Sequence, residues 1–236
     1  MEKPSIYLIP NLLGSEASIE RSLPQENLAI INSLKHFAVE NLKDTRRFLV
    51  RIGLKAKIDE SEFFTLDKRS QIEDLDSILT VLKNGHSVGI ITDAGCPGIA
   101  DPGALLVDIA HQHNYKVVPL IGPSSILLAI MGSGFNGQSF AFNGYLERDS
   151  SKRIKEIRSL EAKMQSQKQT QLFMETPYRN NALLGDLLTY LNPNTKLCIA
   201  ANISLPDEFI QTKSILNWKK NTPDLNKQPT IFLIGN

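Results

Sequence analysis

Cysteine is scarce in this chain of 236 residues, which contains only Cys96 and Cys198. Two cysteines this far apart in sequence are too few for a Cys-x-x-Cys motif or a disulfide framework, so a reducing compartment fits best. An excess of charge is also missing, because 26 Lys and Arg are balanced by 25 Asp and Glu. The net charge of +1 provides no global attraction to nucleic acid or acidic membranes, so a site for a polyanion would have to be local.

Long apolar runs are absent as well, and none approaches the length of a membrane span. The first residues carry only a short apolar run, interrupted by Asn11 and Gly14, which is unlike a signal peptide. These observations favour a cytoplasmic protein that does not contact a membrane.

Several chemical signatures are missing too. The four histidines show no i, i+4 pair and no cluster with Cys or carboxylates, which argues against a zinc or iron site. There is neither a Gly-x-Ser-x-Gly elbow nor a Walker loop. A literal Gly-x-Gly-x-x-Gly occurs at 132–137, but a predicted helix precedes it and a predicted strand follows, the reverse of a dinucleotide fingerprint. We expect this segment to end a helix and turn the chain.

The regular elements indicate an α/β protein, because short β-type runs alternate with longer stretches of helical periodicity. In the N-terminal part, strands are predicted at 5–9, 87–92 and 116–120, and helices at 27–35, 43–51, 72–82 and up to about 113. In the C-terminal part, strands are predicted near 139–143 and at 170–175, 196–201, 208–213 and 230–234, with helices at 126–131, 152–167 and 178–191. We predict a mainly parallel sheet in residues 1–120 and a mixed sheet in residues 121–236, as two lobes.

The loop at 93–103 is the most informative segment, because three glycines and two prolines follow a predicted buried strand. Ligands of open α/β sheets bind at the carboxyl ends of strands. Gly95 and Gly98 would let a ligand approach the main chain, and Asp93 and Asp101 would accept hydrogen bonds from hydroxyl or amino groups. A tight structural connection with capping aspartates would use the same residues.

A second loop, at 121–125, leads from the next predicted strand into a helix. The hydroxyls of Ser124 and Ser125 and the free N–H groups of the helix form a natural site for a carboxylate or amide, although an ordinary helix cap has the same composition. Two such loops at successive strand ends are expected to converge on one cleft.

These two loops closely resemble those of the tetrapyrrole methylase superfamily, and within it the branch of small-subunit ribosomal RNA methyltransferases I. Three further segments extend the resemblance over nearly the whole chain. They are Lys43-Asp44-Thr45-Arg46, Phe142-Asn143-Gly144-Tyr145-Leu146 and Met174-Glu175-Thr176-Pro177-Tyr178-Arg179.

The resemblance implies a homodimer of two-lobed chains that bind S-adenosylmethionine in a cleft between the lobes and transfer its methyl group without a metal. By position it assigns cofactor contacts to Leu13, Asp93, Ala94, Gly95, Cys96, Ser124, Ser125, Ile126, Met174, Ala201, Asn202 and Thr230. A hydroxyl acceptor would benefit from a general base, for which Asp44 and Glu175 are the candidate carboxylates. Either could equally serve in a salt bridge or a helix cap.

Two segments depart from the family pattern. At 10–18 the glycine is displaced and the acidic turn is lost, and at 201–205 the usual Arg, Glu and Lys are replaced by uncharged residues. Fewer cations weaken phosphate contacts, which dominate RNA affinity. Basic clusters at 46–57 and 152–158 could compensate as an RNA footprint, or could simply be solvated helix faces.

Three functions follow from the sequence. The first is 2′-O-methylation of ribose in small-subunit ribosomal RNA, with ribosomal RNA or the small subunit as the partner. The second is methylation of a small molecule such as a tetrapyrrole precursor, which needs no basic surface. The third is a cofactor-binding module without catalysis.

Overall fold

The computed structural model describes residues 3–66 and 75–236. The chain divides into two compact units, Met1–Ser124 and Ser125–Asn236, each with its own sheet. The sequence analysis placed the boundary between residues 120 and 121. This boundary, like the independence of the two lobes, stays a prediction. No helix within the described residues combines the length and the apolar character that a membrane span needs.

The first unit contains a five-stranded sheet in which every strand is parallel to its neighbours, as predicted. Its spatial order is β3 (Glu62–Thr65), β2 (His36–Val39), β4 (Val88–Ile91), β1 (Ser5–Ile9) and β5 (Lys116–Pro119). The sequence analysis missed β2 and β3. They are as short as β4 and β5, but each contains one β-branched residue, whereas β4 contains three and β5 contains two, so their β signal is weaker.

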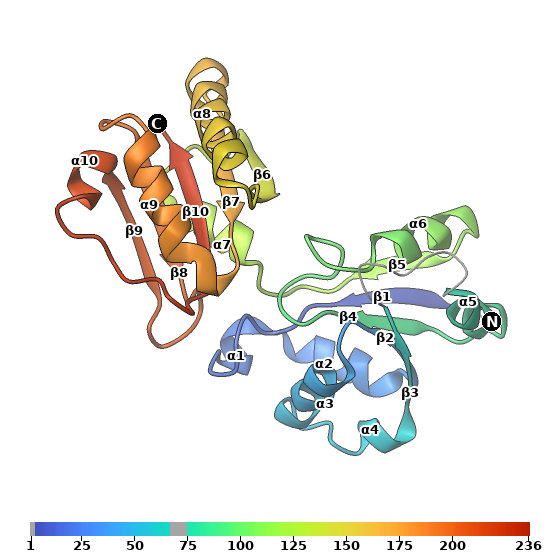
Figure 1. Ribbon diagram of the computed structural model, residues 1–236. Coiled ribbons are helices and arrows are strands. Elements are labelled where there is room, and N and C mark those ends of the chain that lie inside the picture. The colour runs from blue at the N-terminus through green and yellow to red at the C-terminus, as the bar shows by residue number, and fades with distance from the viewer. Residues whose placement is uncertain (1–2, 67–74) are drawn as a thin grey trace. The chain divides into compact units, whose positions relative to one another are not determined.

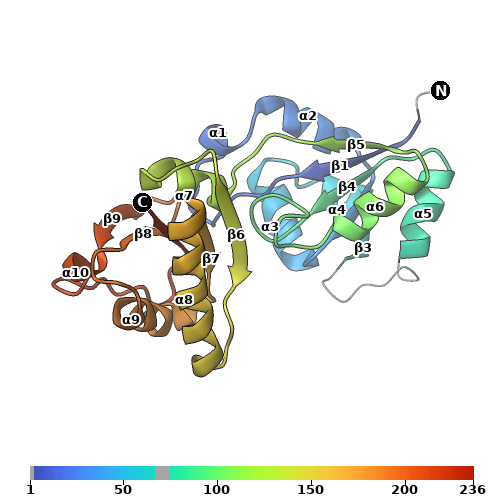
Figure 2. The same cartoon turned by 90° about the horizontal axis from the view of Figure 1, so that it is seen from above.

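Helices cover both faces of this sheet (Figure 1). The unit contains α1 (Ile19–Ser22), α2 (Gln25–Ser33), α3 (Leu42–Arg51), α4 (Lys57–Glu60), α5 (Asp76–Lys83) and α6 (Ala104–Gln112). Ile6 and Ile90 belong to the core formed with α5 and α6, whereas Ile9 and Phe37 point to the opposite face near the end of α2. The views in Figures 1 and 2 agree that α2 and α6 lie on opposite sides of β1. Residues 72–74 of the predicted helix at 72–82 lie outside the described residues.

The second unit contains a mixed five-stranded sheet, again as predicted. Its order is β6 (Phe140–Tyr145), β7 (Thr170–Met174), β10 (Thr230–Gly235), β8 (Lys196–Ala201) and β9 (Phe209–Ser214). The pair β6 and β7 is parallel, and the other three neighbouring pairs are antiparallel. This arrangement follows from the strand-rich tail, whose last three strands are joined without long crossover helices.

One face of this second sheet packs against α8 (Ser150–Gln167), α9 (Asn180–Tyr190) and α10 (Ile215–Trp218), around Phe173, Phe232 and Trp218. The other helix, α7 (Ser125–Ser133), contacts β8, β9 and β10. It ends within the glycine-rich segment at 132–137, where Gly134 has φ +74° and β6 follows shortly after. The prediction that this segment ends a helix, and is not a dinucleotide fingerprint, is confirmed.

Candidate functional site

Three loops meet at the carboxyl edge of the first sheet. They follow β1, β4 and β5, which are parallel neighbours with β1 in the middle. The loop after β1 joins the loop after β4 through a pair of backbone hydrogen bonds: Asn11 N–H donates to the Gly95 carbonyl at 2.8 Å, and Gly95 N–H donates to the Asn11 carbonyl at 3.2 Å. The backbone of the loop at 93–103 is thus held by a two-residue bridge to the chain after β1.

The side chain of Asn11 holds this junction together. Its Nδ2 donates to the carbonyls of Thr92 (3.0 Å) and Asp93 (3.1 Å), and its Oδ1 accepts from the N–H of Leu12 (2.7 Å). The residue is only 6% exposed, so water cannot replace these three hydrogen bonds. The sequence analysis mentioned Asn11 as an interruption of an apolar run and as part of the altered segment at 10–18, but gave it no role. The available signal was an Asn directly after a buried strand, where such side chains bond to the backbone of turns.

The loop after β5 reaches the same junction. Cys96 Sγ lies 3.5 Å from the carbonyl oxygen of Pro123, and an added Cβ on Gly122 would lie 2.2 Å from Cγ of Pro10. The loops at 93–103 and 121–125 therefore meet at Cys96 and Pro123, although β4 and β5 are not adjacent as the order along the chain suggested. That the two loops form one cleft stays a prediction. Burial raises the pKa of the Cys96 thiol, which therefore stays protonated at neutral pH.

This close approach yields a first prediction. Gly122→Ala should lower the free energy of unfolding by about 1–3 kcal/mol, because the proline ring cannot move aside without shifting the loop. Urea denaturation measures this change. Gly185→Ala is the matched control, since Gly185 lies in a helix with no atom within 4 Å of an added Cβ, and it should be neutral or stabilising by up to about 1 kcal/mol. Equal free energies of unfolding for the two variants would contradict the close approach of Gly122 to Pro10.

A cavity of about 330 Å³ opens beside this junction, entirely within the first unit. It is lined by Asn11, Leu12, Leu13, Gly14, Ser15, Asp44, Arg47, Phe48, Arg51, Asp93 and Ala94. Four of the residues predicted from the sequence therefore share one cavity: Leu13, Asp44, Asp93 and Ala94. Arg51 closes one side of it by donating to the carbonyls of Gly14 (2.9 Å) and Ala17.

Asp44 is placed in the cavity by the start of α3. Asn41 caps this helix, and its Oδ1 accepts from the N–H groups of Lys43 (3.0 Å) and Asp44 (3.3 Å). Arg47 Nη1 lies 3.0 Å from Asp44 Oδ1, and the Asp44 side chain is 38% exposed. Within the described part of the chain, Oδ2 of Asp44 has no hydrogen-bond partner. One carboxylate oxygen is therefore held while the other remains accessible.

Glu175, the second candidate base, has a different environment. Its side chain is 4% exposed, its Oε2 pairs with Arg179 at 2.9 Å, and its Oε1 accepts from the N–H of Thr176 at 2.7 Å. Both oxygens are thus used inside the turn that leads to the short helix η2 (Pro177–Arg179). This geometry gives Glu175 a local role in the turn. It belongs to the second unit, whereas Asp44 belongs to the first.

The predicted cofactor residues fall into two groups, one in each unit. In the second unit, Met174, Ala201 and Thr230 come together at one edge of the sheet, because Thr230 pairs with Ala201 and the next residue of β10 pairs with Met174. Asn202 follows with φ +50°, and its N–H donates to the Pro229 carbonyl at 2.9 Å. The group in the first unit is Leu13, Asp93, Ala94, Gly95, Cys96 and Ser124.

Ser125 and Ile126 belong to the second unit, since they begin α7. The sequence analysis assigned the start of this helix to the edge of the first sheet. The body of this helix contacts β8, β9 and β10 of the second sheet. The contribution of its start to a site at the edge of the first sheet stays a prediction. Among residues 3–66 and 75–236, no three His, Cys, Asp or Glu side chains gather as metal ligands.

Comparisons with known proteins place this chain among methyltransferases. A model of the family described as Tetrapyrrole (Corrin/Porphyrin) Methylases matches residues 21–215. Ribosomal RNA small subunit methyltransferase I of Vibrio cholerae is 28% identical over 234 residues, covering 98% of this chain and 77% of the relative. The protein of the same name from Escherichia coli O157:H7 is 25% identical over 232 residues, covering 97% and 77%.

Solved structures show the same fold at lower identity. The methyltransferase CobJ matches with a TM-score of 0.65 and 16% identity, over 99% of this chain and 94% of that one. Uroporphyrin-III C-methyltransferase from Thermus thermophilus, complexed with S-adenosylhomocysteine, matches with a TM-score of 0.57 and 15% identity, over 98% and 97%.

Proposed function

Because this chain belongs to the tetrapyrrole methylase family and is an S-adenosylmethionine-dependent methyltransferase, we propose that it methylates a ribose 2′-hydroxyl of small-subunit ribosomal RNA. The observation that carries this proposal is similarity to ribosomal RNA small subunit methyltransferases I over 97–98% of the chain. The aligned region covers both units and all the segments that contain predicted site residues. The cytoplasm, where ribosomal subunits are found, and a homodimeric state are parts of the same proposal.

The residues of the first unit fit the cofactor. The cavity has two carboxylates, Asp44 and Asp93, and two guanidinium groups, Arg47 and Arg51, beside the apolar side chains of Leu13 and Phe48. This lining suits a ligand that has hydroxyl and charged groups together with an apolar part. Gly95 has φ +68°, a conformation that side-chain-bearing residues rarely adopt, so glycine at this position lets the loop form its backbone bridge to Asn11 beside the cavity. When bound, S-adenosylmethionine supplies a methyl group on a positively charged sulfur that leaves as a neutral thioether.

The protein has little covalent chemistry to perform in such a transfer. Its residues align the acceptor oxygen with the methyl group and exclude water from the site. A hydroxyl acceptor must also lose its proton as the new oxygen–carbon bond forms, which requires a base within hydrogen-bond reach. We assign this role to Asp44, because one of its oxygens is accessible in the cavity whereas both oxygens of Glu175 are occupied.

The test uses small ribosomal subunits isolated from cells that lack this gene, incubated with the purified protein and methyl-labelled S-adenosylmethionine. We expect the label in RNA, within a dinucleotide that resists alkali, because alkaline cleavage needs a free 2′-hydroxyl. Uroporphyrinogen III in a parallel reaction should stay unlabelled. Label on the tetrapyrrole alone, or on an RNA base, would overturn the proposed specificity. Cofactor binding without turnover on either substrate would favour a module without catalysis.

A further inference from the structure

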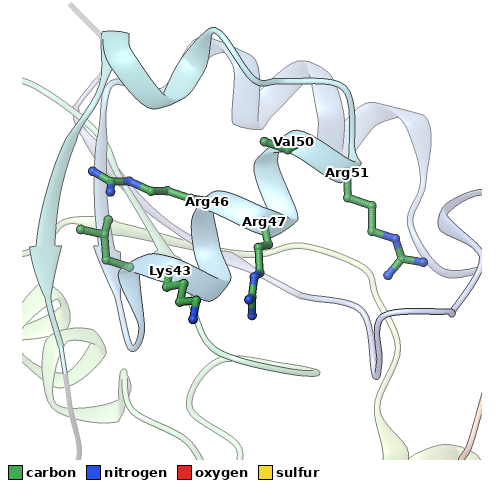
Figure 3. A pocket seen from close by; sticks show the side chains of 6 residues that line it. Lys43, Arg46, Arg47, Val50 and Arg51 are labelled. Carbon is green, nitrogen blue, oxygen red and sulfur yellow. The ribbon is translucent and has the colours of Figure 1, made fainter.

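Helix α3 presents a basic surface on the side that faces away from the core. Thr45, Phe48 and Leu49 are buried and anchor the helix. The opposite side carries two rows of residues spaced four apart, which we call the α3 surface: Lys43, Arg47 and Arg51 in one row, and Leu42, Arg46 and Val50 in the other. These six residues line a cavity of about 610 Å³ (Figure 3).

The charge of this surface is of one sign. Four cations and no carboxylate from the described residues line the cavity. Arg47 is paired with Asp44, and Arg51 is bound to the carbonyls of Gly14 and Ala17. Lys43 and Arg46 are exposed, and neither side chain makes a hydrogen bond or an ion pair within the described part of the chain. These two cations are therefore available to an anionic partner without loss of an internal contact.

Aliphatic side chains lie between the cations. Leu42 is 37% exposed and Val50 is 49% exposed. A surface that alternates cations with apolar contacts suits single-stranded nucleic acid, whose phosphates meet Lys and Arg while its bases lie on apolar groups and guanidinium planes. A lipid surface fits less well, because an interfacial helix needs a continuous apolar face, and α3 buries that face in the protein.

The position of the surface links it to the candidate site. Arg47 and Arg51 line both the α3 cavity and the smaller cavity that contains Asp44 and Asp93. Figure 3 shows Lys43, Arg47 and Arg51 following one another along the same side of the helix. We propose that the α3 surface binds the phosphate backbone of the RNA substrate next to the site of methyl transfer, an inference that rests on the proposed function.

The second basic cluster in the sequence is engaged differently. Arg153 on α8 is buried, with its Nη2 2.6 Å from Oδ2 of Asp186 on α9. The guanidinium of Arg158 lies over the ring of Tyr190, 5.6 Å from its centroid. Two of the four cations in this cluster therefore connect helices, while Lys152 and Lys155 remain exposed. These two lysines provide a control with the same change of charge.

The test measures the affinity of the full-length protein for a fluorescein-labelled single-stranded RNA by anisotropy, at several KCl concentrations. Lys43→Glu/Arg46→Glu should weaken binding roughly 10- to 100-fold, because two phosphate contacts become repulsive. Lys43→Ala/Arg46→Ala should reduce the slope of log K against log salt by about 1.4, at about 0.7 per lost contact. Lys152→Glu/Lys155→Glu should stay within about 2-fold of wild type. Calorimetric titration with S-adenosylhomocysteine verifies that each variant is folded.

The outcomes separate this inference from the proposed function. The role of the α3 surface would be overturned if Lys43→Glu/Arg46→Glu bound RNA with wild-type affinity. It would also be overturned if Lys152→Glu/Lys155→Glu lost as much RNA affinity as Lys43→Glu/Arg46→Glu. Either result would count even if ribosomal RNA is methylated. Selective loss of RNA affinity would support the surface even if the methylation assay fails. A third result would also overturn the proposed role of the α3 surface. In that result, Lys43 and Arg46 are needed for binding to phosphatidylserine vesicles but have no effect on RNA affinity.

Discussion

Asp44→Asn is expected to lower kcat for RNA methylation by about 10²- to 10⁴-fold, the usual contribution of a general base. The amide keeps the shape of the side chain and can still accept from Arg47, but it cannot take the proton of a hydroxyl. KM for RNA should change little, because the substitution removes an interaction that matters mainly in the transition state. Single-turnover kinetics with methyl-labelled S-adenosylmethionine, measured at several RNA concentrations, separates the rate of the chemical step from RNA binding.

Glu175→Gln is the matched control, since it makes the same replacement of a carboxylate by an amide. The amide retains one acceptor oxygen, which can bond to the N–H of Thr176 or to the guanidinium of Arg179 but not to both, and the ion pair with Arg179 is lost. We therefore expect reduced stability, with a far smaller effect on kcat than in Asp44→Asn. If Glu175→Gln abolishes turnover and Asp44→Asn does not, the two assignments must be exchanged. If neither variant affects the chemical step, the reaction needs no carboxylate base from this pair.

Asn11→Ala is expected to destabilise the first unit and to weaken cofactor binding together. The substitution leaves the carbonyls of Thr92 and Asp93 and the N–H of Leu12 without their side-chain partner in a buried junction. Leaving these groups unpaired should lower the free energy of unfolding by about 2–4 kcal/mol. The affinity for S-adenosylhomocysteine should fall about 10- to 100-fold, because the loop at 93–96 loses the support that holds its backbone in place.

Urea denaturation and calorimetric titration measure the two effects of Asn11→Ala. Asn221→Ala is the control, since Asn221 is exposed, and it should change stability by no more than about 0.5 kcal/mol. A loss of stability with unchanged cofactor affinity would show that the junction supports the fold but does not position the cofactor loop.

The elements that sequence analysis predicted correctly are those with strong local signals. Strand β1 was predicted with its observed bounds, and the end of α7 follows from Gly134, whose φ of +74° suits glycine. Strands β2 and β3 were missed, because each contains only one β-branched residue, whereas the equally short β4 and β5 contain three and two. The roles assigned to the predicted site residues stay proposals, although the structure does bring Leu13, Asp44, Asp93 and Ala94 into one cavity.

By itself, the sequence determined the α/β class, the succession of strands and helices and the positions of the two loops, because periodicity and Gly/Pro placement act over a few neighbouring residues. Only the tertiary structure decided which distant residues meet. It placed β1 between β4 and β5, so that Asn11 joins a loop more than 80 residues away. It left one oxygen of Asp44 accessible while it enclosed both oxygens of Glu175. Strand order and side-chain pairing depend on contacts that close long loops of the chain, and no local pattern records them.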